Sequence, residues 1–220
     1  MYPISNFSIR SILGGFDKNF TYLITCNHTR NQIIIDPSVD LKFISPFIYD
    51  KPVAILITHS HHDHIRYLDQ YLESFPRIFV FGHSISADKF LHTSFKIINH
   101  NETIQIGEIQ ITGIHTPGHY FDSICYLIPP AIFTGDTVFV GRTGRVISSG
   151  SNLEELYNSI YKKILTLPNH IRIYPGHHYG NKKSMSLKKN IKESPLLQAN
   201  SFDDFSKRMD EYEENRKANH

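Results

Sequence analysis

Hydrophobic residues in the first part of the chain occur in short runs that are typical of β-strands. Gly, Pro, Asn and charged residues separate these runs, which predict strands at 7–13, 20–25, 32–36 and 53–57. A helix is expected at 40–49, between the last two strands. The apolar positions Ile65, Leu68, Leu72 and Phe75 recur at helical spacing and predict a helix over 65–75. The histidine-rich segment 58–64 therefore lies on a loop that joins a strand to a helix.

Strand-like and helix-like patterns continue through the rest of the chain. They predict strands at 77–82, 95–99, 102–107, 109–116, 123–128, 131–135 and 171–176, with a tight hairpin turn at 129–131. They predict helices at 84–92, 153–165, 184–192 and 202–215. Two series of strands with helices, not separated by a long linker, fit two sheets packed face to face with helices outside. The expected fold class is therefore α/β, in a four-layer arrangement.

The composition is that of a globular soluble protein. The chain has 220 residues, of which 40% are hydrophobic and 20% are charged, enough for one domain with a core. The net charge of +2 does not indicate nucleic-acid or membrane-surface binding. No apolar run approaches the roughly 20 residues that span a bilayer, and the N-terminus has no signal-peptide pattern. The two cysteines, Cys26 and Cys125, cannot form a disulfide framework, so we expect a cytoplasmic protein.

Histidine is the residue type that departs from this ordinary composition, with 14 in the chain. The segment THSHHDH (58–64) contains four histidines and an aspartate. Residues i and i+2 of an extended segment point the same way, so His59 and His61 can hold one ion. Asp63 and His64, at the turn into the helix, can reach a second ion. His62 points away from His61 and is left outside the metal shell.

Three further loops carry metal-capable side chains directly after strand-like runs. They are HTPGHY (115–120), FTGDTVF (133–139) and YPGHHYG (174–180). Imidazole and carboxylate are the usual ligands of zinc and of non-haem iron. Taken alone, His119, Asp136 or His177 is more often an ordinary surface, core or turn residue. Their occurrence together with the 58–64 cluster favours a metal site, outside which we leave His115 and His178.

These four motifs, in this order over roughly residues 7 to 200, resemble those of the metallo-β-lactamase superfamily. The resemblance implies the metallo-β-lactamase fold, a four-layer αββα sandwich with its site at one edge, between the two sheets. It implies a metallo-β-lactamase-like domain over 1–200. The C-terminal helix and charged tail at 201–220 are expected to be part of the same domain.

The resemblance also implies a ligand set and a mechanism. His59, His61 and His119 would bind one metal, Asp63, His64 and His177 a second, and Asp136 would bridge them. Two divalent ions are expected, with zinc first and iron or manganese as alternatives. Such a pair presents a metal-activated hydroxide at neutral pH and polarises the bond under attack. Asp63, as ligand and as the partner that orients the hydroxide, is the expected catalytic residue.

The wording of FTGDTVFVGRTGR and PGHHYG most resembles glyoxalase II (hydroxyacylglutathione hydrolase) in a short form. It implies a small-molecule thioester substrate, possibly derived from glutathione. Arg145 stands where the family has a basic residue that binds the glutathione carboxylate, a role that suits a guanidinium. Tyr179 matches the family's glutathione-binding tyrosine.

The sequence also departs from the glyoxalase II pattern. Val146 and Ile147 replace an aromatic pair, and Tyr120 follows His119 where the family has a small residue. The chain ends soon after His177, without the helical C-terminal domain that supplies further glutathione contacts in the long form. These departures weaken the assignment of glutathione as the thiol.

Alternative activities of the same fold remain open. A persulfide dioxygenase keeps these seven residues but uses a single iron on His59, His119 and Asp136, although the PAHDY and GRTDF wording of that group is absent. An RNA-processing nuclease would need a basic arm, whereas KKSMSLKK (182–189) is better interpreted as a solvated helix face. Lactonase activity is less favoured, and so is β-lactamase activity, because no export signal is visible. We expect no nucleic-acid or membrane partner.

Overall fold

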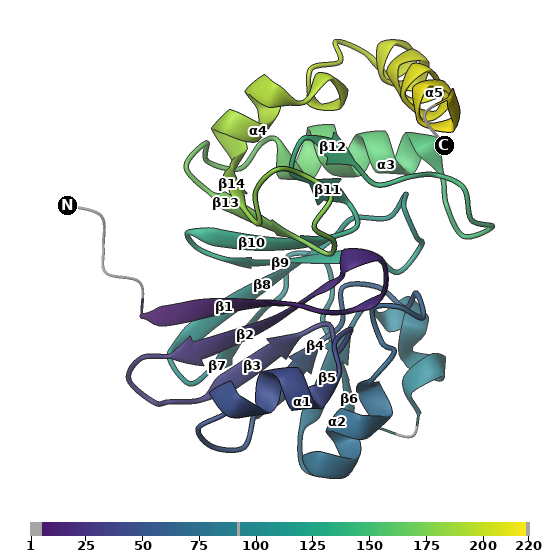
Figure 1. Ribbon diagram of the computed structural model, residues 1–220. Coiled ribbons are helices and arrows are strands. Elements are labelled where there is room, and N and C mark those ends of the chain that lie inside the picture. Colours follow the sequence, from purple (N-terminus) through teal and green to yellow (C-terminus); the bar gives the residue numbers. More distant parts are fainter. Residues whose placement is uncertain (1–5, 92, 219–220) are drawn as a thin grey trace.

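Two six-stranded sheets packed face to face form the centre of the computed structural model, which describes residues 6–91 and 93–218 (Figure 1). The first sheet has the order β1 (Phe7–Leu13), β2 (Phe20–Cys26), β3 (Gln32–Ile35), β4 (Ala54–Leu56), β5 (Phe79–Gly82) and β6 (Phe95–Ile97). The second has the order β14 (Met185–Ser186), β13 (Arg172–Pro175), β10 (Ala131–Gly135), β9 (Ile124–Ile128), β8 (Ile109–His115) and β7 (Thr103–Ile106). Strands β11 (Val138–Phe139) and β12 (Arg142–Thr143) form a separate hairpin.

Helices cover the outer face of each sheet (Figure 1). The first sheet carries α1 (Leu41–Ile44) and α2 (Leu68–Ser74), and the second carries α3 (Leu153–Ser159), α4 (Leu187–Glu193) and α5 (Phe202–Ala218). Short 3₁₀ turns lie at Phe16–Lys18, Ser45–Phe47, Ser84–Phe90 and Pro195–Leu197, and a π turn at Ile160–Ile164 extends α3. The predicted αββα sandwich is confirmed.

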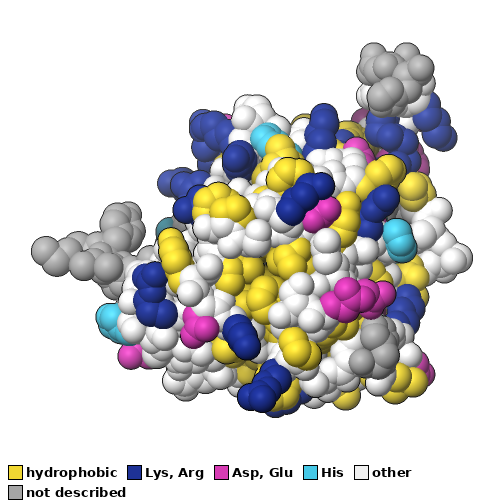
Figure 2. Space-filling model, turned by 60° about the horizontal axis from the view of Figure 1, so that its bottom comes forward, with side chains coloured by type: hydrophobic (Ala, Val, Ile, Leu, Met, Phe, Trp, Pro, Cys, Tyr) yellow, Lys and Arg dark blue, Asp and Glu magenta, His cyan; other side chains and the backbone are white. Residues whose placement is uncertain are grey.

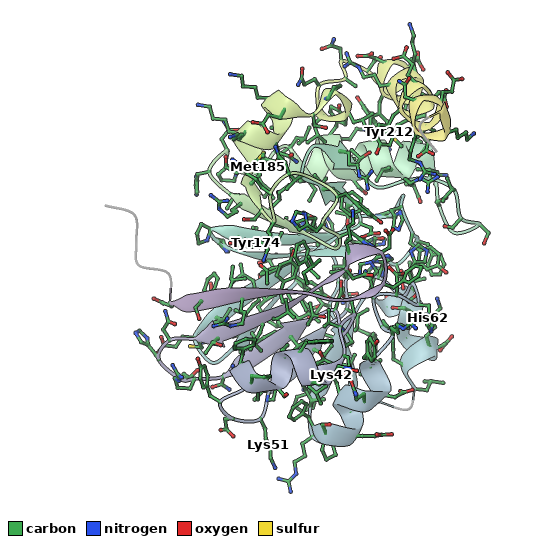
Figure 3. The ribbon with its side chains drawn as sticks, in the orientation of Figure 1. Lys42, Lys51, His62, Tyr174, Met185 and Tyr212 are labelled. Carbon is green, nitrogen blue, oxygen red and sulfur yellow. The ribbon has the colours of Figure 1, made fainter. Side chains whose placement is uncertain are left out.

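The central strands β2, β3, β4 and β10 are buried along their whole length because both faces of each sheet are covered there. In β2, Tyr22 and Ile24 pack between the sheets, while Leu23 packs against the helices beneath the first sheet. The second sheet repeats this: Tyr174 joins the core between the sheets, whereas Met185 joins the core beneath the upper helices (Figure 3). The alternating side-chain directions of a strand thus build three hydrophobic layers.

Most predicted elements appear within a few residues of their expected bounds, and the differences have local causes. The helix expected at 40–49 divides at Pro46, which cannot continue an α-helical hydrogen-bond ladder. The one expected at 84–92 forms 3₁₀ turns. The two-residue strands β11, β12 and β14 have too little sequence for a periodic signal. Residues 1–5, His92 and residues 219–220 lie outside the described residues, so the first residues of the predicted 1–200 domain and the last two of the 201–220 segment are not described.

The strand directions bring the candidate loops to one edge of the sandwich. Strands β3, β4 and β5 are parallel, so their carboxyl ends share an edge, and β2 begins there because it runs antiparallel to β3. Strands β8, β10 and β13 also run in one direction. The backbone N–H of Phe20 donates to the carbonyl of Gly176 at 2.8 Å and joins the two sheets at this edge. The four motif loops therefore converge.

The outer surface on the side of α1 and α2 carries side chains of every kind (Figure 2). Lys and Arg side chains are spread over it, with hydrophobic and acidic side chains between them. Among the described residues, no helix combines the length and the apolar character needed to cross a membrane.

Candidate metal centre

The three histidines expected at the first metal lie together. Nδ1 of His61 is 2.9 Å from Nε2 of His59 and 3.1 Å from Nε2 of His119. His59 and His61 come from the loop after β4, and His119 comes from the loop after β8. Their ligand atoms form one of the groups in this chain that could hold a metal ion.

The residues expected at the second metal form an adjoining group. Nε2 of His177 lies 3.3 Å from Nε2 of His64 and 3.3 Å from Oδ2 of Asp63. Asp136 reaches both groups, since its Oδ2 lies 3.5 Å from Nε2 of His119 and 3.3 Å from Nε2 of His177. The structure thus brings all seven predicted ligands together and places Asp136 between the two sets.

The spacing of these atoms fits divalent metal ions. Ligands about 2.0–2.1 Å from one tetrahedral ion are about 3.3 Å from each other, close to the separations seen here. Oδ1 of Asp136 is buried and has no hydrogen-bond partner within the described residues, although it lies 3.3 Å from Nε2 of His64. Burial and the neighbouring His119 lower the pKa of His61 to about 4, so this ring is neutral, as a ligand must be.

Hydrogen bonds to the other ring nitrogen orient three of the histidines. Nδ1 of His64 lies 2.8 Å from Oδ2 of Asp36, Nδ1 of His119 donates to the carbonyl of Arg145 at 2.9 Å, and Nδ1 of His177 donates to the carbonyl of Asp17 at 2.9 Å. Such partners fix the tautomer and point Nε2 at the metal. The rings are therefore held ready for ligation.

Asp36 is a functional residue that the sequence reasoning missed. It is 2% exposed and accepts hydrogen bonds from the backbone N–H and the hydroxyl of Thr58, at 2.7 and 2.6 Å, besides its contact with His64. It follows β3 directly, beside the strand that leads into the histidine-rich loop. An aspartate at the end of a strand is a common pattern, so the sequence alone did not single out this residue.

Asn19 is a second missed residue, and it is fully buried beside the second group. Its Nδ2 donates to Oδ2 of Asp63 at 3.0 Å and lies 3.3 Å from Nε2 of His177 and 3.4 Å from Nε2 of His64. Its Oδ1 makes no hydrogen bond to any described residue. An asparagine after a glycine-containing loop is an ordinary turn pattern, so its sequence context held no signal for this role.

Gly176 allows the close approach that the centre requires. A Cβ at this position would lie 2.3 Å from Oδ1 of Asp136 and 2.6 Å from the ring of His64. The PGHH motif therefore needs glycine so that His177 can converge on the other ligands.

Aromatic and cationic side chains border the first group. The ring of Tyr120 lies 4.1 Å from the ring of His61, between centroids. Lys89 lies 5.2 Å above Tyr120 and donates from Nζ to Oγ of Ser60 at 2.6 Å. The tyrosine that follows His119 thus forms a wall of the site.

The two predicted glutathione contacts both have partners within the chain. Arg145 forms a bidentate pair with Glu213 of α5, with Nε–Oε1 and Nη2–Oε2 distances of 2.8 and 2.9 Å. Tyr179 stacks on His177 at 4.7 Å and donates its hydroxyl to Asp17 at 2.6 Å. Both residues border the metal centre, and their roles in glutathione binding stay predictions.

The histidines set aside by the sequence reasoning have other surroundings. His62 is exposed at the surface (Figure 3). His115 stacks on His83 at 3.8 Å, and His178 stacks on Phe20 at 5.5 Å. None of the three belongs to the ligand groups found within the described residues.

A groove of about 990 Å³ lies elsewhere, lined by residues that include Phe7, Pro130 and Tyr174. It borders the start of β1 and the β9–β10 turn, away from the edge at which the ligands converge. None of the seven predicted ligands lines it, so the groove plays no part in the metal chemistry.

Comparison with known proteins agrees with this architecture. Residues 89–177 match the metallo-β-lactamase superfamily. A probable polyketide biosynthesis zinc-dependent hydrolase of Bacillus subtilis is 32% identical over 174 residues, 77% of each chain. A probable hydroxyacylglutathione hydrolase of Schizosaccharomyces pombe is 31% identical over 83% of this chain and 72% of its own. The crystal structure of ETHE1 from Myxococcus xanthus has a TM-score of 0.79 and 27% identity, covering 92% of this chain and 90% of its own.

The chain therefore belongs to the metallo-β-lactamase superfamily. Within the superfamily it is similar to hydroxyacylglutathione hydrolases, which confirms the resemblance drawn from the motifs.

Proposed function

We propose that the protein is a metal-dependent thioesterase that hydrolyses a small-molecule thioester. The observation that carries the proposal is the convergence of seven histidine and aspartate side chains at spacings suited to two adjoining metal ions. The relatives named as zinc-dependent hydrolase and hydroxyacylglutathione hydrolase support this reaction class.

The residues would divide the work as follows. One ion would be held by His59, His61 and His119. The other would be held by Asp63, His64 and His177. Asp136 would bind both ions. Bound divalent metal, zinc in our proposal, supplies an activated water and an electrophile for the acyl oxygen.

Asp63 is the residue that we assign to orienting the attacking water. Its side chain is one-quarter exposed, whereas that of His64 is fully buried, so this carboxylate faces the open side of the centre. The N–H of Asn19 and the neighbouring His177 fix one carboxylate oxygen. Although burial opposes ionisation, the hydrogen bonds with His177 and Asn19 lower the pKa of Asp63, so it is a carboxylate at neutral pH.

A persulfide dioxygenase is the second candidate, favoured by the similarity to ETHE1 over most of both chains. In that case His59, His119 and Asp136 would hold a single iron. The same side chains serve either reaction, so metal identity and substrate must be measured together.

The test combines metal analysis with two assays on the purified protein. The thioesterase proposal predicts two metal ions per chain and hydrolysis of an S-lactoyl thioester, both lost in Asp136→Ala. One iron per chain together with oxygen uptake on glutathione persulfide would replace it with the dioxygenase. Turnover of the thioester by a metal-free variant would contradict both.

We propose in addition that residues 201–220 belong to the same domain as 1–200. Burial of Phe205 and Met209 from α5 in one core with Leu156 of α3 supports this. A cytoplasmic location stays a prediction.

A further inference from the structure

The C-terminal helix α5 places a carboxylate on Arg145, whose backbone borders the metal centre. Glu213 takes the position that an incoming carboxylate would take on Arg145, because it engages Nε and Nη2 of the guanidinium as a bidentate pair. Both side chains are partly buried, at 20% exposure for Glu213 and 29% for Arg145. The hydrogen bond from Arg145 lowers the pKa of Glu213, which is therefore ionised at neutral pH.

The backbone of Arg145, which carries one side of this ion pair, lies next to the predicted ligands. The backbone carbonyl of Arg145 accepts the hydrogen bond from Nδ1 of His119, so the arginine is tied directly to the first ligand group. On the other side, the guanidinium of Arg142 lies 3.8 Å above the ring of Tyr179, which stacks on His177. A thiol arm that left the centre in this direction would meet Arg145 and its internal partner.

The helix that carries Glu213 is fixed in place. Phe205 is fully buried and Met209 is 4% exposed in the core beneath the upper helices. Tyr212, on the side of α5 that faces α3, accepts a hydrogen bond from Nη1 of Arg142 at 2.6 Å (Figure 3). Glu213 is thus held at its arginine, and a tethered group competes at a high effective concentration with a free ligand.

We propose that Glu213 is a specificity residue that closes the carboxylate site at Arg145 and selects thioesters whose thiol arm has no carboxylate there. The inference deepens the proposed thioesterase function and rests on it for the reaction. It separates this chain from an enzyme tuned to glutathione, whose carboxylates would have to displace Glu213. Ile147, which is 66% exposed two residues after Arg145, gives an uncharged arm an apolar surface in the same loop.

The direct test is the affinity of the metal-loaded protein for S-methylglutathione, a non-hydrolysable probe, measured by calorimetry. Glu213→Gln removes the competing charge and is expected to lower the Kd about tenfold. The double variant Glu213→Gln/Arg145→Ala should not show this tighter binding, because the tighter binding depends on the guanidinium of Arg145. Glu214→Gln, an exposed neighbour on α5, is the matched control and should bind as the wild type does.

A parallel assay compares the lactoyl thioesters of glutathione and of N-acetylcysteamine, which is uncharged. The quantity compared is kcat/KM for the glutathione thioester divided by kcat/KM for the N-acetylcysteamine thioester. Glu213→Gln should raise this ratio about tenfold. Equal affinity of wild type and Glu213→Gln for the probe, with unchanged melting temperature, would overturn the inference. If Glu213→Gln binds the probe more tightly but neither thioester is hydrolysed, the role of Glu213 at Arg145 would stand. The proposed thioesterase function would then be wrong.

Discussion

Asp36→Asn tests whether the metal ligands depend on their supporting hydrogen bonds. Asp36 accepts three hydrogen bonds, two from Thr58 and one from His64. An asparagine has the same shape and tolerates the positive φ of 50° at this position. It has only one acceptor oxygen, so when that oxygen keeps the backbone N–H of Thr58, its NH₂ group faces Nδ1 of His64, which loses its acceptor.

The magnitude follows from the loss of one of these bonds. Loss of an outer partner of a metal-bound histidine typically weakens metal binding 10- to 100-fold, which corresponds to about 1.4–2.8 kcal/mol. We expect this loss at the second ligand group, which contains His64, and a smaller change at the first. Titration of the metal-free protein with zinc against a chromophoric chelator measures both affinities.

The matched control is Asp50→Asn, an exposed carboxylate whose hydrogen bond is to the neighbouring Lys51 N–H. It should leave both zinc affinities unchanged. If Asp36→Asn bound two zinc ions as tightly as the wild type, the supporting role of Asp36 would be wrong. An equal loss at both positions would instead point to general disruption of the loop.

Three further predictions concern other parts of the molecule. Asn19→Ala, which removes the N–H donor to the second ligand group, should weaken zinc binding there about tenfold, and an unchanged affinity in the chelator titration would contradict this role. Burial and the neighbouring His115 lower the pKa of His83 to about 4 in the folded protein. In the unfolded chain the pKa of a histidine is about 6.5. The unfolded state therefore binds more protons, and stability should fall as pH drops from 6.5 towards 4. His83→Gln should make the fall in the melting temperature of the metal-free chain over that range less steep, and the exposed His62→Gln should not. Phe205→Ala should lower the free energy of unfolding by about 3–5 kcal/mol, and a loss in urea denaturation no larger than that of the exposed Phe16→Ala would show that α5 is not part of the core.

The fold could be predicted because its strands carry a strong and repeated signal. Runs such as QIII in β3 and FTYLITC in β2 are buried on both faces, so they are rich in apolar and β-branched residues and easily recognised. The sequence predicts the type and the ends of the helices less well. The reason is that α1 and the 84–90 segment are short and tertiary contacts decide their form. Hairpin β11–β12 is held by neighbouring elements rather than by its own four paired residues.

The seven predicted ligands are recognisable in the sequence because histidine and aspartate occur at fixed spacing within short motifs. Asp36 and Asn19 are not, because their roles arise from strand order: β2 begins and β3 ends at the same edge as the loop after β4. The partner of Arg145 was likewise beyond the sequence. Glu213 is one of several glutamates near the end of α5, and only the packing of that helix selects it.

The most direct test of the central claim is the rate of hydrolysis of S-lactoyl-N-acetylcysteamine as zinc is added to the metal-free protein. We predict that the rate rises with zinc up to two equivalents per chain, and that Asp136→Ala shows no rise because it lacks the carboxylate between the two ligand groups. A metal-free wild type that turns over the thioester, or an Asp136→Ala variant that responds to zinc as the wild type does, would contradict it.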